Sequence, residues 1–223
     1  MAPESTRAAI HEAVRAHAQA IELDVQMTRD RRVVIFHDDR LERTTNGHGR
    51  LADTSYGHVA SLDAGSWFGA RFAGERVLLV SQALGAIPSR MGLNLELKRT
   101  SHGTLFMRRL LPLVRRDRPR GRLLLSSFEP ALLRPLRTSR LPYALICRTT
   151  PDQSLSLAIR LNCFAWHPLH TLLTQRRIHR AHQAGLRVQA WAVDDLRRAR
   201  RLIAWGVDGI FTNDPARLRG LAA

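Results

Sequence analysis

The chain of 223 residues has only two cysteines, one lysine and 6% aromatic residues. Two cysteines cannot build the disulfide framework of a small secreted domain, and Cys147 and Cys163 lie in apolar stretches, so we expect two buried free thiols. No apolar run is long enough to span a bilayer. The first residues, MAPESTRAAIHEAV, lack the basic and apolar regions of a signal peptide. These absences predict a cytoplasmic protein without stable membrane insertion.

Acidic residues are also scarce, since 19 Asp and Glu face 35 Lys and Arg, which gives a formal net charge of +16. Such a charge can indicate a nucleic-acid partner. The arginines, however, are spread over the whole chain and form no single block, and Lys98 is the only lysine. The skew toward arginine therefore resembles a coding bias as much as a binding surface. We expect small anionic ligands and no nucleic acid, and we keep a basic nucleic-acid-binding protein as an alternative.

Short apolar segments alternate with helical patterns, which predicts an α/β protein built from parallel β/α units. The predicted parallel strands are 21–25, 93–97, 123–127, 143–147, 164–166, 188–193 and 209–212. Residues 33–37 follow the first strand too closely for a parallel crossover, so we expect an antiparallel hairpin there. A (β/α)8 barrel needs eight parallel strands. The sequence thus predicts one domain over residues 1–223, a TIM-like barrel that lacks its first strand, with a small insertion at about 39–80.

Two predicted strands carry acids that share a face. Glu22 and Asp24 are two residues apart, and Glu96 stands two residues before Lys98 in the strand Asn94-Leu95-Glu96-Leu97-Lys98. Like charges in a strand core repel unless a cation or a proton lies between them. Three carboxylates around one centre suit Mg²⁺ or Ca²⁺. The alternative is that each acid pairs with an arginine near the surface.

His37 and Lys98 are the other candidate functional residues. His37 ends a strand and opens a polar loop, where an imidazole can donate or accept a proton near neutral pH, and Asp38 or Asp39 could orient it. Lys98 shares a strand with a proposed ligand, and its compact ammonium suits a phosphate oxygen. A chance lysine at the surface explains Lys98 equally well.

Several motifs resemble, in order, those of the cytoplasmic bacterial glycerophosphodiester phosphodiesterases: A-P-E-S-T, I-E-L-D-V-Q-M-T-R-D, V-V-I-F-H-D-D-R-L-E-R-T-T-N-G, L-D-A-G-S-W-F, N-L-E-L-K, L-L-S-S-F and G-V-D-G-I-F-T-N-D-P. The resemblance implies a TIM-like barrel with a small insertion, a divalent cation, and hydrolysis of glycerophosphodiesters to glycerol 3-phosphate and an alcohol. By motif position it implies Glu22, Asp24 and Glu96 as metal ligands, His37 as one of two acid–base histidines, and Lys98 and Trp191 as substrate contacts.

This chain also departs from the pattern. The family's His-Arg pair on the first strand, which supplies the second histidine and a phosphate-binding arginine, has no counterpart after Met1. Ser5 replaces the helix-opening Asn and is expected to cap the first helix. Arg31 replaces a hairpin glycine and should strain that turn if it needs positive φ. Trp191-Ala192-Val193-Asp194 stands for Trp-Thr-Val-Asn, so a polar contact is expected to be lost.

Three functions therefore compete. The first is an active phosphodiesterase whose start lies upstream of Met1. The second is a truncated relative with weak or no activity that still binds metal or phosphate, because one acid–base histidine is missing. The third is the basic nucleic-acid-binding protein. The sequence leaves open the alcohol portion of the substrate, the choice between Mg²⁺ and Ca²⁺, and the oligomeric state.

Overall fold

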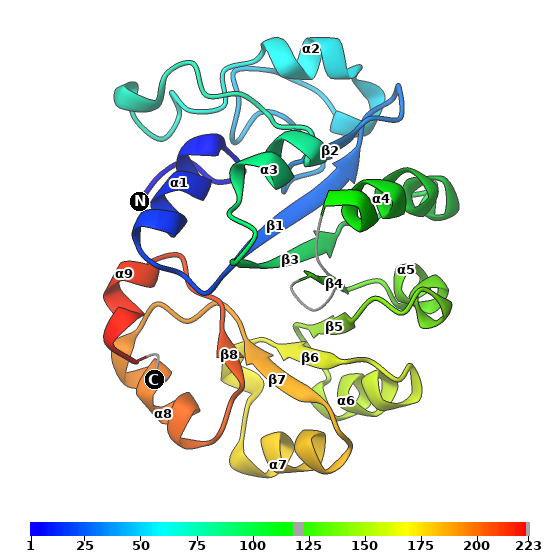
Figure 1. Ribbon diagram of the computed structural model, residues 1–223, viewed down its shortest axis with the longest axis vertical. Coiled ribbons are helices and arrows are strands. Elements are labelled where there is room, and N and C mark those ends of the chain that lie inside the picture. Colours follow the sequence, from blue (N-terminus) through cyan, green and yellow to red (C-terminus); the bar gives the residue numbers. More distant parts are fainter. Residues whose placement is uncertain (118–122, 222–223) are drawn as a thin grey trace. The chain divides into compact units, whose positions relative to one another are not determined.

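A hairpin and a parallel strand pair organise the first part of the chain in the computed structural model, which describes residues 1–117 and 123–221 (Figure 1). The described residues fall into two units, Met1–Leu123 and Leu124–Ala223. The first unit contains α1 (Arg7–Arg15), β1 (Ala20–Met27), β2 (Val33–Ile35), α2 (Tyr56–Ser61), α3 (Val80–Ala86), β3 (Gly92–Leu97) and α4 (Gly103–Asp117). Single-turn 3-10 helices lie at Leu51–Asp53 and Ala70–Phe72. The single domain over residues 1–223 stays a prediction.

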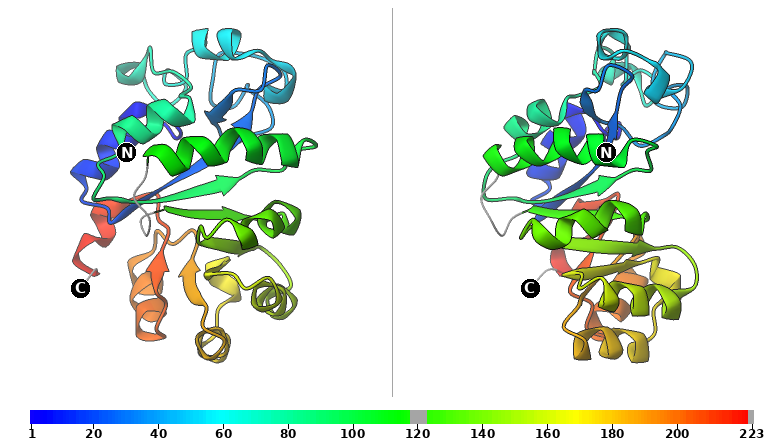
Figure 2. Two further views of the ribbon diagram at one scale, coloured as in Figure 1. Left: turned by 45° about the vertical axis from the view of Figure 1, so that its right-hand side comes forward. Right: turned by 90° about the vertical axis from the view of Figure 1, so that its right-hand side faces the viewer.

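Strand pairing in the first unit follows the predicted hairpin. β1 pairs with β2 in antiparallel register and with β3 in parallel register. In the parallel pair, Asp24 lies opposite Glu96. Leu23, Val25, Leu95 and Leu97 are buried on both strands, as expected for a parallel pair covered on its faces. Helices α1, α3 and α4 lie side by side in both figures (Figure 2). This register decides where the acids of the two strands meet.

The first helix begins differently from the prediction. Thr6, not Ser5, is the N-cap, and its hydroxyl accepts a hydrogen bond from the backbone N–H of Ala9. Ser5 instead adopts φ = 61° in the left-handed region. Asn tolerates that region better than most residues, because its short amide can bond to nearby backbone. The expected Ser5 cap is therefore wrong, and the family's Asn fits this position through its backbone conformation.

Residues 39–80, which the sequence predicts to be an insertion, contain helices and loops and no β-strand. The insertion packs a small core of its own against the outer end of the hairpin. The members of this core are Val34, Phe36, Leu41, Leu51, Val59, Leu62, Ala64 and Val77. Since Phe36 belongs to it, the insertion fixes the backbone that leads into His37. Helix α3, which follows the insertion, has no counterpart among the predicted elements; its start is held by Gln82, whose side chain accepts from the N–H of Leu79.

The second unit alternates strands and helices throughout. It contains β4 (Leu123–Ser127), α5 (Pro130–Leu133), β5 (Tyr143–Cys147), α6 (Pro151–Arg160), β6 (Ala165–Pro168), α7 (Gln175–Gln183), β7 (Arg187–Ala190), α8 (Leu196–Ala204), β8 (Gly209–Ile210) and α9 (Pro215–Leu218). Single-turn or short 3-10 helices lie at Arg134–Thr138, His170–Leu172 and Arg219–Leu221. Strands β4 to β8 are consecutive parallel neighbours. Figure 1 shows α6, α7 and α8 on the same outer side of these strands.

Two helix ends and two cysteines of the second unit show the behaviour typical of their residue types. Helices α7 and α8 are followed by Gly185 and Gly206 at φ = 78° and 90°, the left-handed position that glycine takes after a helix end. Cys147 and Cys163 are buried free thiols. Within the described residues, no helix has both the length and the apolar character needed to cross a membrane.

Arg31 occupies the strained position of the hairpin turn, with φ = 65°. Its N–H donates to the carbonyl of Thr28, and the side chain is exposed. In this region of φ, a residue with a Cβ destabilises the folded chain by about 1–2 kcal/mol. Glycine avoids this strain, but it raises the entropy of the unfolded chain, which lowers the stability by about 0.4–1 kcal/mol. We therefore expect Arg31→Gly to stabilise the protein by about 0.5–1 kcal/mol, as measured by urea unfolding. Arg29→Gly, in the same turn without positive φ, is the control and should not stabilise. Equal changes in stability for Arg31→Gly and Arg29→Gly would contradict backbone strain at Arg31.

Candidate functional site

Three carboxylates from the paired strands β1 and β3 converge in the first unit. Glu22 and Asp24 project from one face of β1, and Glu96 projects from β3 in register with Asp24. One oxygen from each carboxylate lies within 4.8 Å of the others. A single cation with ligand distances of about 2.0–2.6 Å can therefore reach all three oxygens. The predicted convergence of these acids is what the structure shows.

The electrostatics of the cluster show its need for positive charge. Although Glu22 as a whole is accessible to solvent, loss of hydration at its carboxylate, together with repulsion from Asp24 and Glu96, raises the pKa of Glu22 well above its usual value. Burial also raises the pKa of Asp24 to about 6, even though Lys98 works in the opposite direction. Carboxylates with raised pKa values bind a proton or a cation more readily than solvated ones.

Lys98 already supplies part of that charge. Its ammonium nitrogen lies 2.9 Å from Oε1 of Glu96 and 3.2 Å from Oδ1 of Asp24. Burial works to lower the pKa of Lys98, but the two carboxylates outweigh this and raise it. Only 18% of the Lys98 side chain is exposed, so Lys98 is held between two acids rather than extended into solvent. Its contact with a phosphate stays a prediction.

His37 follows β2 and is held by its neighbour. Its Nδ1 lies 2.5 Å from Oδ1 of Asp38, so Asp38 is the acid that orients it. The backbone on either side is clamped by Gln26 of β1, whose amide nitrogen lies 2.7–3.0 Å from the carbonyl oxygens of Phe36, His37 and Asp38. About half of the His37 side chain is exposed, and His37 is close enough to Asp24 to lower that acid's pKa. An accessible imidazole beside the acid cluster can exchange a proton with a substrate.

A second group of acids meets at His37. Glu4, His37 and Asp38 also place ligand atoms within 4.8 Å of one another, an arrangement that could hold a metal ion. Arg43, however, already lies between the two acids. Its guanidinium donates to both oxygens of Glu4 at 2.6 and 2.9 Å and to both oxygens of Asp38 at 2.6 and 2.8 Å. The positive charge at this group is therefore the arginine.

Trp191, the predicted substrate contact, lies in the second unit directly after β7. Its indole N–H donates to the carbonyl of His167 at 2.8 Å, and its ring meets that of Phe128 edge-on. The guanidinium of Arg148 stands over both rings, at 5.5 Å from Phe128 and 5.6 Å from Trp191. These three side chains follow the carboxyl ends of β7, β4 and β5. Ligand-binding residues of parallel β/α proteins sit at such ends, but the role of Trp191 stays a prediction.

Asp194 stands where the family pattern near Trp191 has Asn. Its carboxylate accepts from the hydroxyl of Thr212 and from the backbone and side-chain amides of Asn213, each at 2.8 Å. Burial tends to raise the pKa of Asp194, but these hydrogen bonds outweigh burial and lower it. Asp194 thus ties two strand ends together within the second unit.

The sequence alone does not indicate roles for Glu4, Gln26 or Arg43. Arg43 stands in the quoted motif with His37, six residues further on, which is the only local signal for its role. Its pairing with Glu4 spans 39 residues and joins the segment before α1 to the loop after β2. Only the folded first unit brings these residues together.

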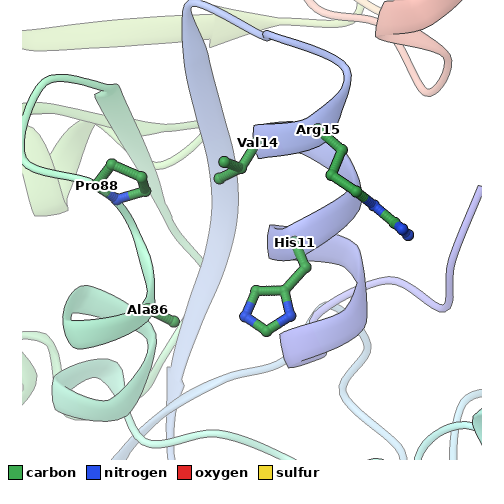
Figure 3. A pocket seen from close by; sticks show the side chains of 5 residues that line it. All are labelled: His11, Val14, Arg15, Ala86 and Pro88. Atoms are coloured by element: carbon green, nitrogen blue, oxygen red, sulfur yellow. The ribbon is translucent and has the colours of Figure 1, made fainter.

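A hollow elsewhere in the first unit is unrelated to these acids. It lies between α1 and the chain after α3 and is lined by His11, Val14, Arg15, Ala86 and Pro88 (Figure 3). In Figure 3, the His11 ring faces the hollow and Arg15 extends away from it. None of the converging carboxylates lines this hollow, so it has no part in the candidate site.

Comparison with known proteins places the chain among related sequences. The profile described as "Glycerophosphoryl diester phosphodiesterase family" matches residues 1–217. A glycerophosphodiester phosphodiesterase of Caldanaerobacter subterraneus subsp. tengcongensis is 32% identical over 225 residues, covering 98% of this chain and 92% of the relative. These matches agree with the resemblance of the motifs.

Solved structures support the fold. A phosphodiesterase of Oleispira antarctica, in complex with the product sn-glycerol-3-phosphate, matches with a TM-score of 0.93 and 28% identity over 98% of this chain and 91% of that protein. A glycerophosphodiester phosphodiesterase of Agrobacterium tumefaciens matches with a TM-score of 0.84 and 27% identity over 99% and 94%. The predicted TIM-like barrel class is confirmed by these matches. The strand expected upstream of Met1 stays a prediction.

His167 precedes the carboxyl end of β6 and is 1% exposed. Burial lowers its pKa to about 3, so it is a poor proton donor near neutral pH. The unfolded chain takes up this proton below about pH 6.5, the folded chain only near pH 3. Above pH 6.5, His167 is neutral in both states and does not lower the free energy of unfolding. As the pH falls from 6.5 toward 3, only the unfolded chain binds the proton, so the free energy of unfolding falls.

We expect urea unfolding to show a steeper fall of stability from pH 6.5 to 5 in the wild type than in His167→Asn, by up to about 1.4 kcal/mol per pH unit. All carboxylates are common to both proteins, so their titration cancels in the difference. Parallel curves would mean that His167 is protonated equally in both states.

Proposed function

Since the chain belongs to the glycerophosphoryl diester phosphodiesterase family, we propose that it is a metal-dependent phosphodiesterase. It hydrolyses glycerophosphodiesters to glycerol 3-phosphate and an alcohol. The observation that carries this proposal is the convergence of Glu22, Asp24 and Glu96 from adjacent strands within 4.8 Å. The product in the Oleispira antarctica structure is the product expected here.

Each residue has a proposed part in the reaction. Glu22, Asp24 and Glu96 hold a divalent cation, Mg²⁺ or Ca²⁺, since both are hard ions that prefer carboxylate oxygens. The cation supplies Lewis-acid polarisation of the phosphate when bound. Lys98 is placed beside the carboxylates, where its ammonium neutralises them and contacts a phosphate oxygen.

His37 exchanges the proton. Because Asp38 accepts from Nδ1, the Nε2 atom is left to take a proton from the attacking hydroxyl or to give one to the leaving alcohol. Trp191 contacts the substrate with an apolar ring whose orientation is fixed by its hydrogen bond to the His167 carbonyl. The proposed partner is thus a small glycerophosphodiester in the cytoplasm, and nucleic acid is not a partner.

The metal site is tested by calorimetric titration with Ca²⁺ and with Mg²⁺. Glu96→Gln removes one charged ligand of three, so we expect the affinity for the cation to fall at least about tenfold. Asp53→Asn is the matched control, because Asp53 is an exposed acid of the insertion outside the cluster. Its affinity should equal that of the wild type. Equal binding by Glu96→Gln and the wild type would contradict the site.

Activity is tested by the release of glycerol 3-phosphate from glycerophosphocholine and glycerophosphoethanolamine. We expect release to stop with a chelator and to return with the divalent cation. His37→Gln should lower kcat by about 10²–10⁴-fold, because it removes an acid–base group. His58→Gln, on the exposed face of α2, should leave kcat unchanged.

A different pattern would favour the competing reading. If the wild type bound the cation through the three carboxylates but released no glycerol 3-phosphate, the protein would be a relative that holds metal or phosphate without catalysis. Loss of activity in His58→Gln to the same extent as in His37→Gln would remove the special role of His37.

A further inference from the structure

Arg43 is the residue through which the proton-transfer histidine is attached to the rest of the first unit. Its guanidinium uses one edge for the Glu4 carboxylate and another for the Asp38 carboxylate, with four N···O distances of 2.6–2.9 Å. Asp38 in turn lies 2.5 Å from Nδ1 of His37. The chain of contacts thus runs from Glu4 before α1, through Arg43 and Asp38, to the imidazole.

We propose that Arg43 is a positioning residue, which holds the Asp38 carboxylate in one orientation and thereby fixes His37 with its proton on Nδ1 and its Nε2 free for proton exchange. This inference rests on the proposed function of His37. Arg43 acts through Asp38 and is not assigned a contact with substrate or metal.

The chemistry of the pair supports this role. A carboxylate that accepts two parallel hydrogen bonds from a guanidinium cannot rotate freely, because the planar fork matches its two oxygens. Arg43 lowers the pKa of Asp38 to about 2, so Asp38 is an anion throughout the range in which an imidazole titrates. An anion can only accept, and the ring nitrogen that faces it must therefore carry the proton.

The second carboxylate explains how Arg43 itself is held. The Asp38 and Glu4 hydrogen bonds raise the pKa of Arg43, and they arrive from different segments of the chain, so the guanidinium is fixed from both sides. Nη2 of Arg43 lies 3.5 Å from Nδ1 of His37, which is too long to replace the bond between His37 and Asp38. The charged groups around the imidazole are thus Asp38 and Arg43 from its own loop, Glu4 from the N-terminal segment, and Asp24 from β1.

The local geometry makes Asp38 dependent on such support. His37 and Asp38 are adjacent in sequence and both partly exposed, at 49% and 25% of their side chains. An exposed ion pair without further partners contributes little, because both side chains remain mobile in water. Arg43 supplies the missing partner, while Gln26 holds only the backbone of the same segment.

The direct test is the tautomer of His37, which can be read from ring ¹⁵N–¹H correlation spectra at a pH where the imidazole is neutral. His37→Gln identifies the signals. We expect the proton on Nδ1 in the wild type, and a shift of the population toward Nε2–H in Arg43→Gln and Asp38→Asn. Arg40→Gln is the matched control, because Arg40 is an exposed arginine of the same loop that pairs with Glu42 instead, and it should keep the wild-type tautomer. An unchanged tautomer in Arg43→Gln would overturn the proposal, and so would an equal shift in Arg40→Gln.

Steady-state kinetics provide a second test of the role of Arg43. Arg43→Gln should lower kcat about 10–100-fold with KM within about threefold, since a loss of orientation is felt in the transition state and not in ground-state binding. In the Asp38→Asn background the same change should cost less than about threefold, because the two residues act in series. Full additivity of the two changes would overturn the proposal.

Two further variants separate geometry from charge and from folding. Arg43→Lys keeps the charge but loses the fork, so it should resemble Arg43→Gln in both readouts, and wild-type behaviour would overturn the proposal. Thermal melting should show Arg43→Gln folded at the assay temperature. If the wild type released no glycerol 3-phosphate, the proposed function would fail, whereas the tautomer experiment would still decide the role of Arg43.

Discussion

Repulsion between three carboxylates is the constraint on which the site depends. Parallel pairing of β1 and β3 sets Asp24 opposite Glu96 and puts Glu22 on the same face, so the fold itself forces the acids together. Loss of hydration, with repulsion from the neighbouring acids added to it, raises the pKa values of Glu22 and Asp24. Lys98 relieves part of this repulsion with one ammonium for three acids. A partly buried cluster that stays short of positive charge is suited to a divalent cation.

The proton-transfer side of the site is built on a different principle. His37 is placed by backbone support and by exposed ion pairs rather than by burial. The insertion packs Phe36 into its own core, Gln26 bonds to the carbonyls of three successive residues, and Asp38 fixes the ring. The left-handed Arg31 in the turn between β1 and β2 is the strained point of the same hairpin. The metal-binding acids thus depend on strand register, whereas the histidine depends on a loop and its anchors.

Much of this could be predicted from the sequence, because it follows from local patterns. Period-2 placement of Glu22 and Asp24 and the short link to β2 determined the acid face and the hairpin. Arg31 was expected to be strained because a glycine position had lost its glycine, and its positive φ confirms that. The Ser5 cap failed because an apt residue one position later, Thr6, took the cap and left Ser5 in the left-handed region.

What could not be predicted depends on long-range contacts. The pairing of Arg43 with Glu4 joins residues 39 apart, and no local period indicates it. In a chain with 35 basic residues, nothing in the sequence separates Arg43 from the other arginines by type alone. The burial of His167 was equally hidden, since a histidine at a strand end can face either solvent or core. Its exposure of 1% follows from packing in the second unit, where its ring meets Phe211 edge-on.

The most direct measurement is a crystal structure of the protein with Mn²⁺, a carboxylate-binding ion that anomalous scattering can locate. We expect one strong anomalous peak about 2.0–2.6 Å from oxygens of Glu22, Asp24 and Glu96, and none at Glu4, His37 and Asp38, where Arg43 already provides the charge. A peak at the second group with none among the three strand carboxylates would contradict the proposed metal site.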